Sequence, residues 1–544
     1  MCGIAGAAGV PDANLKVKEM LAALAHRGPD ACGIYQNESL SIGNTLLKIT
    51  GDMPQPLRAK GALVLNGEIF NFKELALEAG IITDSDTNLL FSLIETQIKK
   101  GRLPLDAVFN SLSKVNGDYA LAYVYENELI LARDPVGIKP LFYFSKEKKS
   151  EETGNQNEKE TEKREQIGKQ TEKNSLFFAS EKKAFFSSEY TEHSVNTGKK
   201  EKIGNTEKDV RPFPPGSVLS FNTQNGQIQE KSLEIKQPKE RISGEIDALS
   251  LLKKTLKEAV KIRLTDTSGI AFSGGIDSTL IAAIAKKINP DITLYAVGFP
   301  GSYDIIQAES AAEALGLQDA LKKHLFSQEE VKAAVPEVIY ATESVDPMKI
   351  AIGLPLYLLA KKVKADGKRV LLTGQGADEL FGGYKRHEGF LEKGPELLDK
   401  EIYSDLRNLS TINLERDDMV TMANSVELRV PFLDKEVIKV GLAINPELKV
   451  LKKDELYIRK YILRKAAESF LPAELVWKEK KAMQYGTGVQ KVLDKLARDA
   501  GFSKKAGNPL EKYFKQIVQE KRYKFIENGS IAKNQGLNSK DNGN

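Results

Sequence analysis

The residue with the clearest chemical potential stands at the start of the chain, where Cys2 follows Met1. Removal of Met1, which the small Cys2 side chain permits, would place a free α-amine beside the Cys2 thiol. An α-amine has a pKa of about 7.7–8.0, so it can accept the thiol proton near neutral pH. The start of the chain therefore predicts an amine-activated thiol nucleophile that needs no histidine or aspartate. A buried, inert cysteine is the simpler alternative for Cys2 taken alone.

A glycine-rich turn in the second half of the chain has the features of a phosphate site. The segment SGGIDS follows a short apolar run and opens a helix, and it supplies Ser273, Gly274, Gly275, Asp277 and Ser278. Two glycines let the backbone approach a phosphate closely, and the exposed N–H groups at a helix start attract anions. No Gly-Lys-Ser/Thr sequence follows, so the turn is not a Walker A loop. We therefore predict a polyphosphate-binding loop of another kind.

Two acidic residues extend this phosphate site toward a metal ion. Asp277 stands at the mouth of the helix, where a carboxylate that faces polyphosphate is unfavourable unless Mg²⁺ lies between them. A second Gly-rich turn after a strand, TGQGADELFGGY, supplies Asp378 as the other candidate metal ligand, with Glu379 beside it. The sequence thus predicts an Mg²⁺ site made of Asp277 and Asp378.

Two different folding patterns must position these residues. The first half combines β-branched and aromatic runs with polar turn residues, which is typical of antiparallel hairpins, and amphipathic helices interleave with them. From about residue 240, short apolar strands alternate with Gly-rich turns and helices, which is typical of a doubly wound parallel sheet. We expect an α+β sandwich, with antiparallel sheets between helices, followed by an α/β doubly wound domain.

Changes in composition predict the domain boundaries. Two highly charged segments, poor in aliphatic residues, cannot bury enough apolar surface to offset their ordering entropy, so we expect disordered insertions there. The ordered piece between them, LFFASEKKAFF, indicates that the first insertion interrupts a hairpin at a surface loop. The expected segments are a first domain at 2–215 with insertions at about 146–174 and 189–209, a linker at 216–240, a second domain at 241–525 and a flexible tail at 526–544.

The overall composition limits the class of protein. The 544 residues are 41% hydrophobic and 28% charged, with a formal net charge of +4, which gives no support to nucleic-acid or membrane partners. No stretch approaches the ~20 apolar residues that cross a bilayer. The two cysteines, Cys2 and Cys32, exclude a disulfide framework and favour a reducing, cytoplasmic location. The four histidines are scattered, without the spacing of a zinc site.

Five motifs in the first part of the chain resemble the class II glutamine amidotransferase domain, an N-terminal-nucleophile hydrolase. They are MCGIAG at the start, HRGPD (26–30), NGEIFN (66–71), SDT (85–87) and RDPVGIKPLFY (133–143). The resemblance implies that Cys2 attacks the side-chain amide of glutamine and releases ammonia. It also implies an oxyanion hole formed by the side-chain amide of Asn66 and the backbone N–H of Gly67.

The same resemblance implies a glutamine-binding pocket. Asp86 would pair with the α-ammonium of glutamine, with Glu68 beside it, and Arg27 would lie near the site or form a purely structural ion pair. One position departs from the family, since Leu46 stands where an arginine usually grips the α-carboxylate of glutamine. Lys48 lies two residues on and so on the same face of a strand, and our hypothesis is that it replaces this arginine.

Four motifs in the second half extend the resemblance to the glutamine-hydrolysing asparagine synthetases. They are SGGIDS, TGQGADELFGGY, SVELRVPFLD and WKEKKAMQYGTG, and AVGFPGSYD matches as well. The resemblance implies that Val297 flanks the adenine of ATP and that Thr373 and Gly374 contact the nucleotide. It also implies that Lys480 stabilises negative charge on the adenylating phosphate, whereas we expect Arg429 to form a scaffold ion pair. The implied cofactors are ATP and Mg²⁺, and the implied assembly is a homodimer.

Gln375 is a second departure, because the family commonly has a glutamate there that is implicated in deprotonating the attacking ammonia or amine. A glutamine side chain cannot act as a base. Three alternatives stay open. Another carboxylate such as Glu379 supplies the function, ammonia arrives unprotonated through an internal tunnel, or the acceptor is not aspartate.

The resemblance as a whole implies an enzyme with two sites. Ammonia from glutamine would pass to a β-aspartyl-AMP formed from aspartate and ATP, which gives asparagine, AMP and pyrophosphate. A related synthetase that adenylates a different carboxylate is the main alternative, kept open by Leu46 and Gln375. A sugar-phosphate amidotransferase needs no ATP, so the SGGIDS turn argues against it. An inactive binding paralogue would not need Cys2 and Lys480 together with both metal carboxylates.

Overall fold

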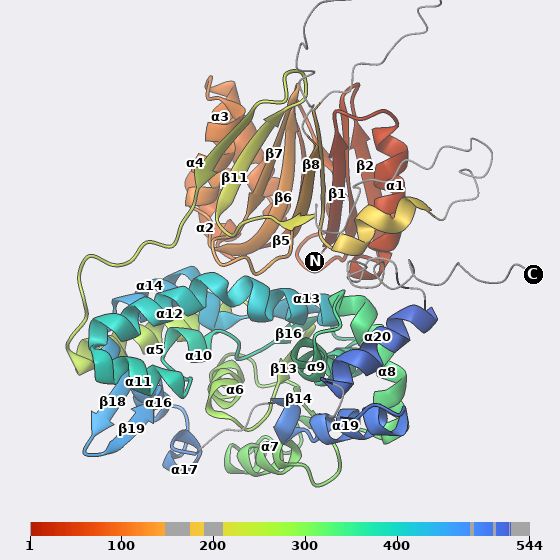
Figure 1. Cartoon of the computed structure of the whole chain (residues 1–544). Helices are drawn as coiled ribbons and strands as arrows, with labels where there is room; N and C mark the ends of the chain where they lie inside the picture. The colour runs from red at the N-terminus through yellow and green to blue at the C-terminus, as the bar shows by residue number, and fades with distance from the viewer. Residues whose placement is uncertain are drawn as a thin grey trace, which may run out of the picture.

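The computed structural model describes residues 2–146, 174–189, 210–478, 483–503, 507–521 and 523. The expected insertions, apart from their end residues, and the expected tail lie outside these residues. The chain forms two halves stacked on each other, an upper one built around antiparallel sheets and a lower one built around a parallel sheet (Figure 1).

The N-terminal half is a four-layer sandwich. Two six-stranded antiparallel sheets, ordered β10-β8-β9-β1-β3-β2 and β12-β11-β7-β6-β5-β4, pack face to face. Alternate residues of each strand point inward, so Ile4 and Ile42 of the first sheet share a core with Val64 and Ala122 of the second. Helix α1 covers the outer face of the first sheet, and α2, α3 and α4 cover the second. The predicted α+β sandwich is confirmed.

The bounds of its elements are as follows. The strands are β1 (Cys2–Ala8), β2 (Ala31–Gln36), β3 (Leu40–Leu46), β4 (Leu57–Arg58), β5 (Ala62–Ile69), β6 (Gly117–Tyr125), β7 (Glu128–Arg133), β8 (Phe142–Lys146), β9 (Ser175–Ala179), β10 (Arg211–Pro212), β11 (Ser217–Asn222) and β12 (Ile228–Ser232). The helices are α1 (Ala13–Ala23), η1 (Ala25–Arg27), α2 (Phe72–Ala79), α3 (Asp86–Lys99), α4 (Pro104–Ser113) and η2 (Lys182–Glu189).

The first insertion interrupts a hairpin, as predicted. Strands β8 and β9 pair in antiparallel register from Phe142 opposite Ala179 to Lys146 opposite Ser175. The described residues on either side of the segment 147–173 thus end and begin opposite each other at one end of this hairpin.

The linker predicted at 216–240 begins too early. Strand β11 pairs with β7 and β12 pairs with β11, so both extend the second sheet, and Val218 and Phe221 of β11 are buried. Residues 213–216, just before the predicted linker and at its start, form the turn that enters β11, and Gly216 takes a φ of +72° there. The connection to the first helix of the second half spans residues 233–244.

The C-terminal half is built on a five-stranded parallel sheet, ordered β15-β14-β13-β16-β17. Side chains of β14 and β16 alternate between two cores. Leu294 and Leu372 pack with α5, α6 and α12, whereas Tyr295 and Leu371 pack with α8, α9 and α19. The strand order reverses between β13 and β16, and ligands of doubly wound sheets bind at the carboxyl ends of the strands at such a reversal. The predicted doubly wound domain is confirmed.

The bounds of the elements in this half are as follows. The strands are β13 (Ser268–Ala271), β14 (Leu294–Gly298), β15 (Leu321–Leu325), β16 (Val370–Leu372), β17 (Glu427–Arg429), β18 (Val450–Lys453) and β19 (Leu456–Arg459). The helices are α5 (Glu245–Lys261), α6 (Ile276–Ile288), α7 (Tyr303–Ala314), α8 (Gln328–Thr342), α9 (Pro347–Ala365), α10 (Ala377–Leu380), α11 (Arg386–Lys393), α12 (Pro395–Leu409), η5 (Ser410–Leu414), α13 (Glu415–Met422), η6 (Pro431–Leu433), α14 (Lys435–Ala443), α15 (Pro446–Lys449), α16 (Tyr461–Ala467), α17 (Ala473–Val476), α18 (Met483–Gly486), α19 (Val489–Asp499) and α20 (Pro509–Lys521).

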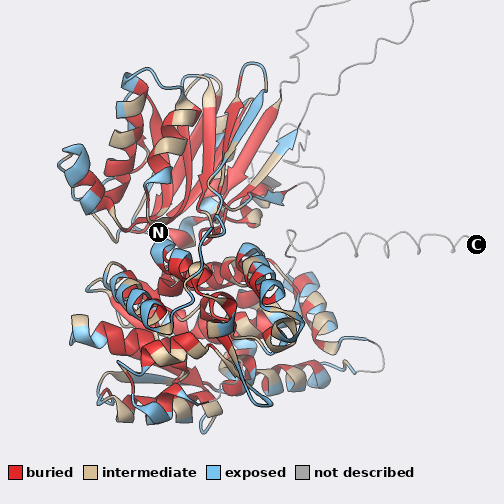
Figure 2. Ribbon diagram, turned by 90° about the vertical axis from the view of Figure 1, so that its left-hand side faces the viewer, coloured by how far each residue is buried: buried red, intermediate tan, exposed pale blue. Residues whose placement is uncertain are grey.

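The two halves are joined by buried ion pairs. Helices α12, α13 and α14 lie along the junction (Figure 1), and the burial colours of Figure 2 show both halves with buried interiors and exposed outer helix faces. Four fully buried arginines reach across it, each to a carboxylate of the other half. The pairs are Arg27–Asp418 at 2.8 Å, Arg133–Glu415 at 3.4 Å, Arg263–Asp118 at 3.6 Å and Arg429–Glu68 at 3.1 Å. Removal of one member of a buried pair typically costs about 3–5 kcal/mol, so these contacts hold the halves in one arrangement.

Among the residues that the structure describes, no helix is both long and apolar enough to cross a membrane.

Candidate active sites

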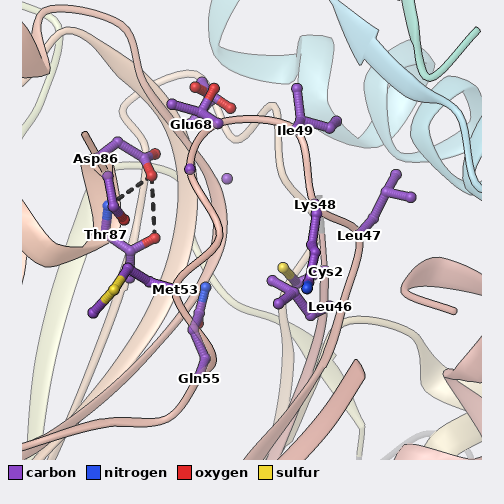
Figure 3. A pocket seen from close by; sticks show the side chains of 14 residues that line it. Cys2, Leu46, Leu47, Lys48, Ile49, Met53, Gln55, Glu68, Asp86 and Thr87 are labelled. Carbon is purple, nitrogen blue, oxygen red and sulfur yellow. Dashed lines mark hydrogen bonds between the residues drawn. The ribbon is translucent and has the colours of Figure 1, made fainter. Parts of the chain in front are cut away.

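A pocket opens at the end of the first sheet, beside the start of the chain. Figure 3 shows Cys2 and Lys48 on one side of it and Glu68 and Asp86 on the other. The pocket is lined by Cys2, Leu46, Leu47, Lys48, Ile49, Thr50, Gly51, Met53, Gln55, Gly67, Glu68, Ser85, Asp86 and Thr87. Strand β1 supplies the thiol, β5 supplies Gly67 and Glu68, and the first turn of α3 supplies Asp86.

Cys2 is held at the bottom of this pocket through its backbone. It lies opposite Leu46 in the register of β1 and β3, and only 3% of it is exposed. The Cys2 nitrogen donates to Asn66 Oδ1 at 3.1 Å, and the Cys2 carbonyl accepts from Arg27 Nε at 3.1 Å. Burial raises the pKa of the Cys2 thiol, while the positive charge of the chain terminus beside it acts to lower this pKa. A base close to the thiol is therefore needed for nucleophilic attack.

Asn66 and Gly67 belong to β5 and lie next to Cys2. Because Asn66 Oδ1 accepts from the Cys2 nitrogen, its Nδ2 points elsewhere, and this buried donor has no partner among the described residues. A buried donor without a partner costs about 1–3 kcal/mol, and a ligand oxygen would remove that cost. Gly67 cannot be replaced by a larger residue, because a Cβ there would come within 2.2 Å of the Asp118 carbonyl.

Asp86 and Glu68 form a pair of buried carboxyl groups across the pocket. Asp86 accepts from the backbone N–H of Thr87 at 2.6 Å and of Ile69 at 3.0 Å, and Figure 3 marks its contacts with Thr87. Burial and the nearby Glu68 carboxylate raise the pKa of Asp86 to about 8. Burial also raises the pKa of Glu68, although Arg429 at 3.1 Å opposes that rise. A cationic group in the pocket would favour both ionised forms.

Lys48 lines the pocket but not as part of a strand. Strand β3 ends at Leu46, so the alternation that would place Lys48 on the face of Leu46 does not apply to it. The Lys48 ammonium forms an ion pair with Asp52, and 42% of the side chain is exposed. Its backbone N–H donates to Asp30 Oδ2 at 2.9 Å. The loop that follows β3 therefore places the Lys48 side chain at the rim of the pocket.

The second predicted site lies at the carboxyl ends of β13 and β16, where the doubly wound sheet reverses. The SGGIDS loop connects β13 to α6, and Gly274 takes a φ of +70° with a Cβ position only 2.3 Å from the Gln307 carbonyl. A glycine is required there on both counts. The hydroxyls of Ser273 and Ser278 lie 3.3 Å apart, and Asp277 is buried in the first turn of α6.

The turn after β16 packs directly against this loop. A Cβ on Gly374 would lie 2.8 Å from the Asp277 Cβ, so the two turns touch. Thr373 donates its backbone N–H to the Arg429 carbonyl at 3.0 Å, and its buried hydroxyl has no partner among the described residues. Val297 is buried near the end of β14, which lies beside β13 in the sheet. The 273–278 loop and the turn at Thr373 and Gly374 thus come together, as predicted, whereas Lys480 lies outside the described residues.

Lys460 occupies the centre of this site, and sequence reasoning missed it. Its ammonium lies 2.9 Å from both carboxylate oxygens of Asp277 and 2.6 Å from Asp378 Oδ1. The two predicted metal ligands therefore converge on one point, as a shared cation requires. Mg²⁺ is usually bound by one or two carboxylates together with substrate phosphates, so the donor set fits Mg²⁺. No cluster of three or more metal-ligating side chains occurs among the described residues.

Gln375, Glu379 and Arg429 complete the site. Glu379 is buried and accepts from the Tyr384 hydroxyl and from Asn413 Nδ2 at 3.0 Å, and burial raises its pKa. Gln375 donates to Asp417 rather than to Glu379. Arg429 forms the expected scaffold ion pairs, and these connect the two halves. Its guanidinium contacts Glu68 of the first pocket and Glu427 of its own half, and its carbonyl accepts from the backbone N–H of Thr373.

Comparisons with known proteins agree with this arrangement. A family model described as asparagine synthase matches residues 251–392 and 390–523, and one described as glutamine amidotransferase domain matches residues 1–232. A putative glutamine-hydrolysing asparagine synthetase 1 of Methanocaldococcus jannaschii is 35% identical, over 96% of this chain and 100% of that protein. Asparagine synthetase B of Escherichia coli K12 is 28% identical over 96% of this chain and 91% of that protein, and asparagine synthetase 1 of Lotus japonicus is 28% identical over 95% and 86%. The chain belongs to the asparagine synthase family, with a glutamine amidotransferase domain on its N-terminal side.

Proposed function

We propose that this enzyme makes asparagine from aspartate, ATP and glutamine, with the residues described above in the following roles. The observation that carries the proposal is the continuity of the two sites through Arg429. Its side chain reaches Glu68 of the thiol pocket and its backbone reaches Thr373 of the nucleotide loop. Arg429 thus links the two sites inside the protein. We infer that ammonia released at Cys2 passes along this buried junction, away from water that would hydrolyse an activated acyl group.

Glutamine hydrolysis is assigned to the first pocket. The Cys2 thiol attacks the side-chain amide of glutamine, with the freed α-amine of Cys2 as base and Asn66 Oδ1 holding that amine in place. The unpartnered Nδ2 of Asn66 and the backbone N–H of Gly67 then donate to the oxyanion. Asp86, with Glu68 beside it, pairs with the α-ammonium of glutamine.

Amide formation is assigned to the second site. The carboxylate of aspartate is a poor electrophile, and transfer of AMP to it supplies a good leaving group. The 273–278 loop and Thr373 with Gly374 would hold the phosphates, Val297 would flank the adenine, and Lys480 would stabilise charge on the reacting phosphate. When bound, Mg²⁺ would neutralise the phosphates, held by Asp277 and Asp378.

Product analysis tests the proposed reaction directly. With aspartate, glutamine and Mg-ATP, we expect asparagine, AMP and pyrophosphate in equal amounts. ADP with phosphate would contradict the adenylate mechanism. Exchange of labelled pyrophosphate into ATP without any response to aspartate would favour a different carboxylate as acceptor, the alternative that Leu46 and Gln375 raise.

A homodimer and a cytoplasmic location remain predictions. A nucleophilic thiol at Cys2 needs a reducing compartment, which supports the second of these. Light scattering of the purified protein measures the first.

Lys48→Ala tests the rim cation of the glutamine pocket. We expect the KM for glutamine to rise roughly threefold to tenfold, because a partly exposed ion pair is worth about 1 kcal/mol, while ammonia-dependent synthesis stays unchanged. Lys60→Ala, which removes an exposed lysine outside the pocket lining, is the matched control. An unchanged KM in Lys48→Ala would remove Lys48 from the glutamine site.

Glutamine binding should release a proton near pH 7. Because the pKa of Asp86 is about 8, this group is mostly protonated at pH 7, and an ammonium ion beside it favours the carboxylate. Affinity for glutamine should therefore rise with pH up to about 8, by at most about tenfold per pH unit. Calorimetry on a Cys2→Ala variant, in buffers of different ionisation enthalpy, measures the released proton without turnover. The same experiment with Asp86→Asn added should show weak binding and no release, and release that persists there would assign the proton to another group.

A further inference from the structure

Two consecutive aspartates on α13 face different sites. This helix lies along the junction between the halves (Figure 1). Asp418 accepts from Arg27 Nη2 at 2.8 Å, and Arg27 Nε donates to the Cys2 carbonyl at 3.1 Å. The next side chain, Asp417, accepts from Gln375 Nε2 at 2.5 Å. Gln375 therefore follows directly on Thr373 and Gly374 of the predicted nucleotide site, and it contacts the same helix that reaches Arg27.

The Asp417 carboxylate is completely buried, and hydrogen-bond donors contact both of its oxygens. Its Oδ1 accepts from Arg416 Nε and Nη2, both at 2.8 Å, and its Oδ2 accepts from Gln375. Arg416 is itself 4% exposed, so the ion pair neutralises the charge inside the protein. The second carboxylate oxygen remains for the amide of Gln375.

This contact determines which end of the Gln375 amide faces the site. An ionised carboxylate only accepts hydrogen bonds, whereas a glutamine amide donates through Nε2 and accepts through Oε1. Nε2 must therefore face Asp417, and Oε1 is directed away from it. Among the described residues this is the one hydrogen bond of the Gln375 side chain, which is partly exposed while Asp417 is not. The contact with Asp417 therefore leaves Gln375 with an acceptor oxygen of defined direction.

We propose that Asp417 is a positioning residue for amide formation, which holds Gln375 so that Oε1 accepts an N–H of incoming ammonia. This hydrogen bond directs the nitrogen lone pair toward the activated carboxyl carbon. The C–N bond forms, the C–O bond to AMP breaks with its electron pair on the phosphate oxygen, and the surplus proton of the nitrogen leaves with that phosphate. The inference rests on the proposed function and deepens it, since the pair provides the acceptor oxygen that the family's glutamate would provide at position 375.

Asp417→Asn is the first test. The amide introduced at position 417 must direct its oxygen to Arg416, so its NH₂ group faces Gln375. The Gln375 amide then rotates to accept from this group and presents its own NH₂, a donor, to ammonia. With ammonia as nitrogen source, we expect the asparagine formed per AMP to fall about 10- to 100-fold, the size of effect that follows from a misplaced reactant. Aspartate-dependent exchange of pyrophosphate into ATP should stay within about twofold of the wild type.

The charge-swap variant, Gln375→Glu with Asp417→Asn, is the decisive test. In this variant the side chain at 417 donates the hydrogen bond and the side chain at 375 accepts it, and the net charge is unchanged. The amide oxygen at 417 still accepts from Arg416, and the carboxylate at 375 again offers an acceptor oxygen to ammonia. Asparagine per AMP should return to within about threefold of the wild type. Gln375→Glu alone places two carboxylates within hydrogen-bond distance, and we expect it to lower the ratio as Asp417→Asn does.

A merely structural role for Asp417 makes different predictions. In that case Asp417→Asn would lower pyrophosphate exchange and thermal stability together with the ratio of asparagine to AMP. Adding Gln375→Glu would restore none of these three quantities. Asp418→Asn is the matched control, since it removes a buried α13 carboxylate that faces Arg27, and with ammonia it should leave the asparagine ratio unchanged. An unchanged ratio in Asp417→Asn, or a double variant no better than that single one, would overturn the inference. A wild type without aspartate-dependent exchange would instead contradict the proposed function.

Discussion

Cys2→Ala is expected to abolish glutamine-dependent asparagine synthesis and to leave ammonia-dependent synthesis within about twofold of the wild type. The Cys2 thiol lines the pocket next to Asn66, whose Nδ2 has no partner among the described residues. Loss of a covalent nucleophile removes its whole reaction path, so we expect a decrease of about 10³-fold or more. Asparagine formation with glutamine and with ammonium chloride, measured side by side, separates the two sites.

The chain provides a matched control for this experiment. Cys32 is the other free cysteine, is exposed on β2 and does not line the pocket, so Cys32→Ala should keep both activities. Glutamine-dependent synthesis that survives in Cys2→Ala would contradict the assignment of the nucleophile. Mass spectrometry of the active protein should also show Cys2 as the first residue, because an attached Met1 leaves the Cys2 nitrogen as an amide that cannot accept a proton.

The motifs that carry chemistry could be predicted because each one stands at the end of a single element. Cys2 begins β1 and Asp277 lies in the first turn of α6, so the start of the chain and a local pattern of glycine, apolar and acidic residues mark these two. Asp86, which begins α3, was predicted from the family resemblance. Strand order then brings Asp277 and Asp378 together, since both follow strands that meet at the reversal of a doubly wound sheet. Local pattern and topology together were sufficient for these residues.

Residues whose role depends on contacts between distant segments were not predictable in this way. Lys460 lies 183 residues from Asp277 and follows a short hairpin with no distinctive pattern, so nothing near it in the sequence indicates its partners. The strand argument for Lys48 failed because β3 ends at Leu46, and alternation holds only while the strand continues. Strand β12 was assigned to the linker because it lies at a sheet edge and its exposed residues lack an apolar run.

Lys460→Met is expected to lower aspartate-dependent pyrophosphate exchange about 10²- to 10³-fold and to leave glutamine hydrolysis within about twofold. A buried ammonium held between Asp277 and Asp378 stands where the polyphosphate would bind, and loss of one such charge contact in a water-poor site has an effect of this size. Lys465→Met, on the adjoining helix α16 and in an exposed i,i+3 ion pair with Glu468, should leave both activities unchanged.

Thermal unfolding with and without Mg²⁺ distinguishes this role from a structural one. Without the ammonium, Asp277 and Asp378 lose the cation that they share, so Lys460→Met should unfold at a lower temperature than the wild type. Mg²⁺ in the absence of ATP should then restore part of the loss, because the metal can take the position between the carboxylates that the ammonium held. Lys460→Met combined with Asp378→Asn should lose this response to Mg²⁺. If Mg²⁺ shifts the unfolding temperature equally in the wild type and in both variants, the metal binds elsewhere. Lys460 would then be the cation that Asp277 and Asp378 bind.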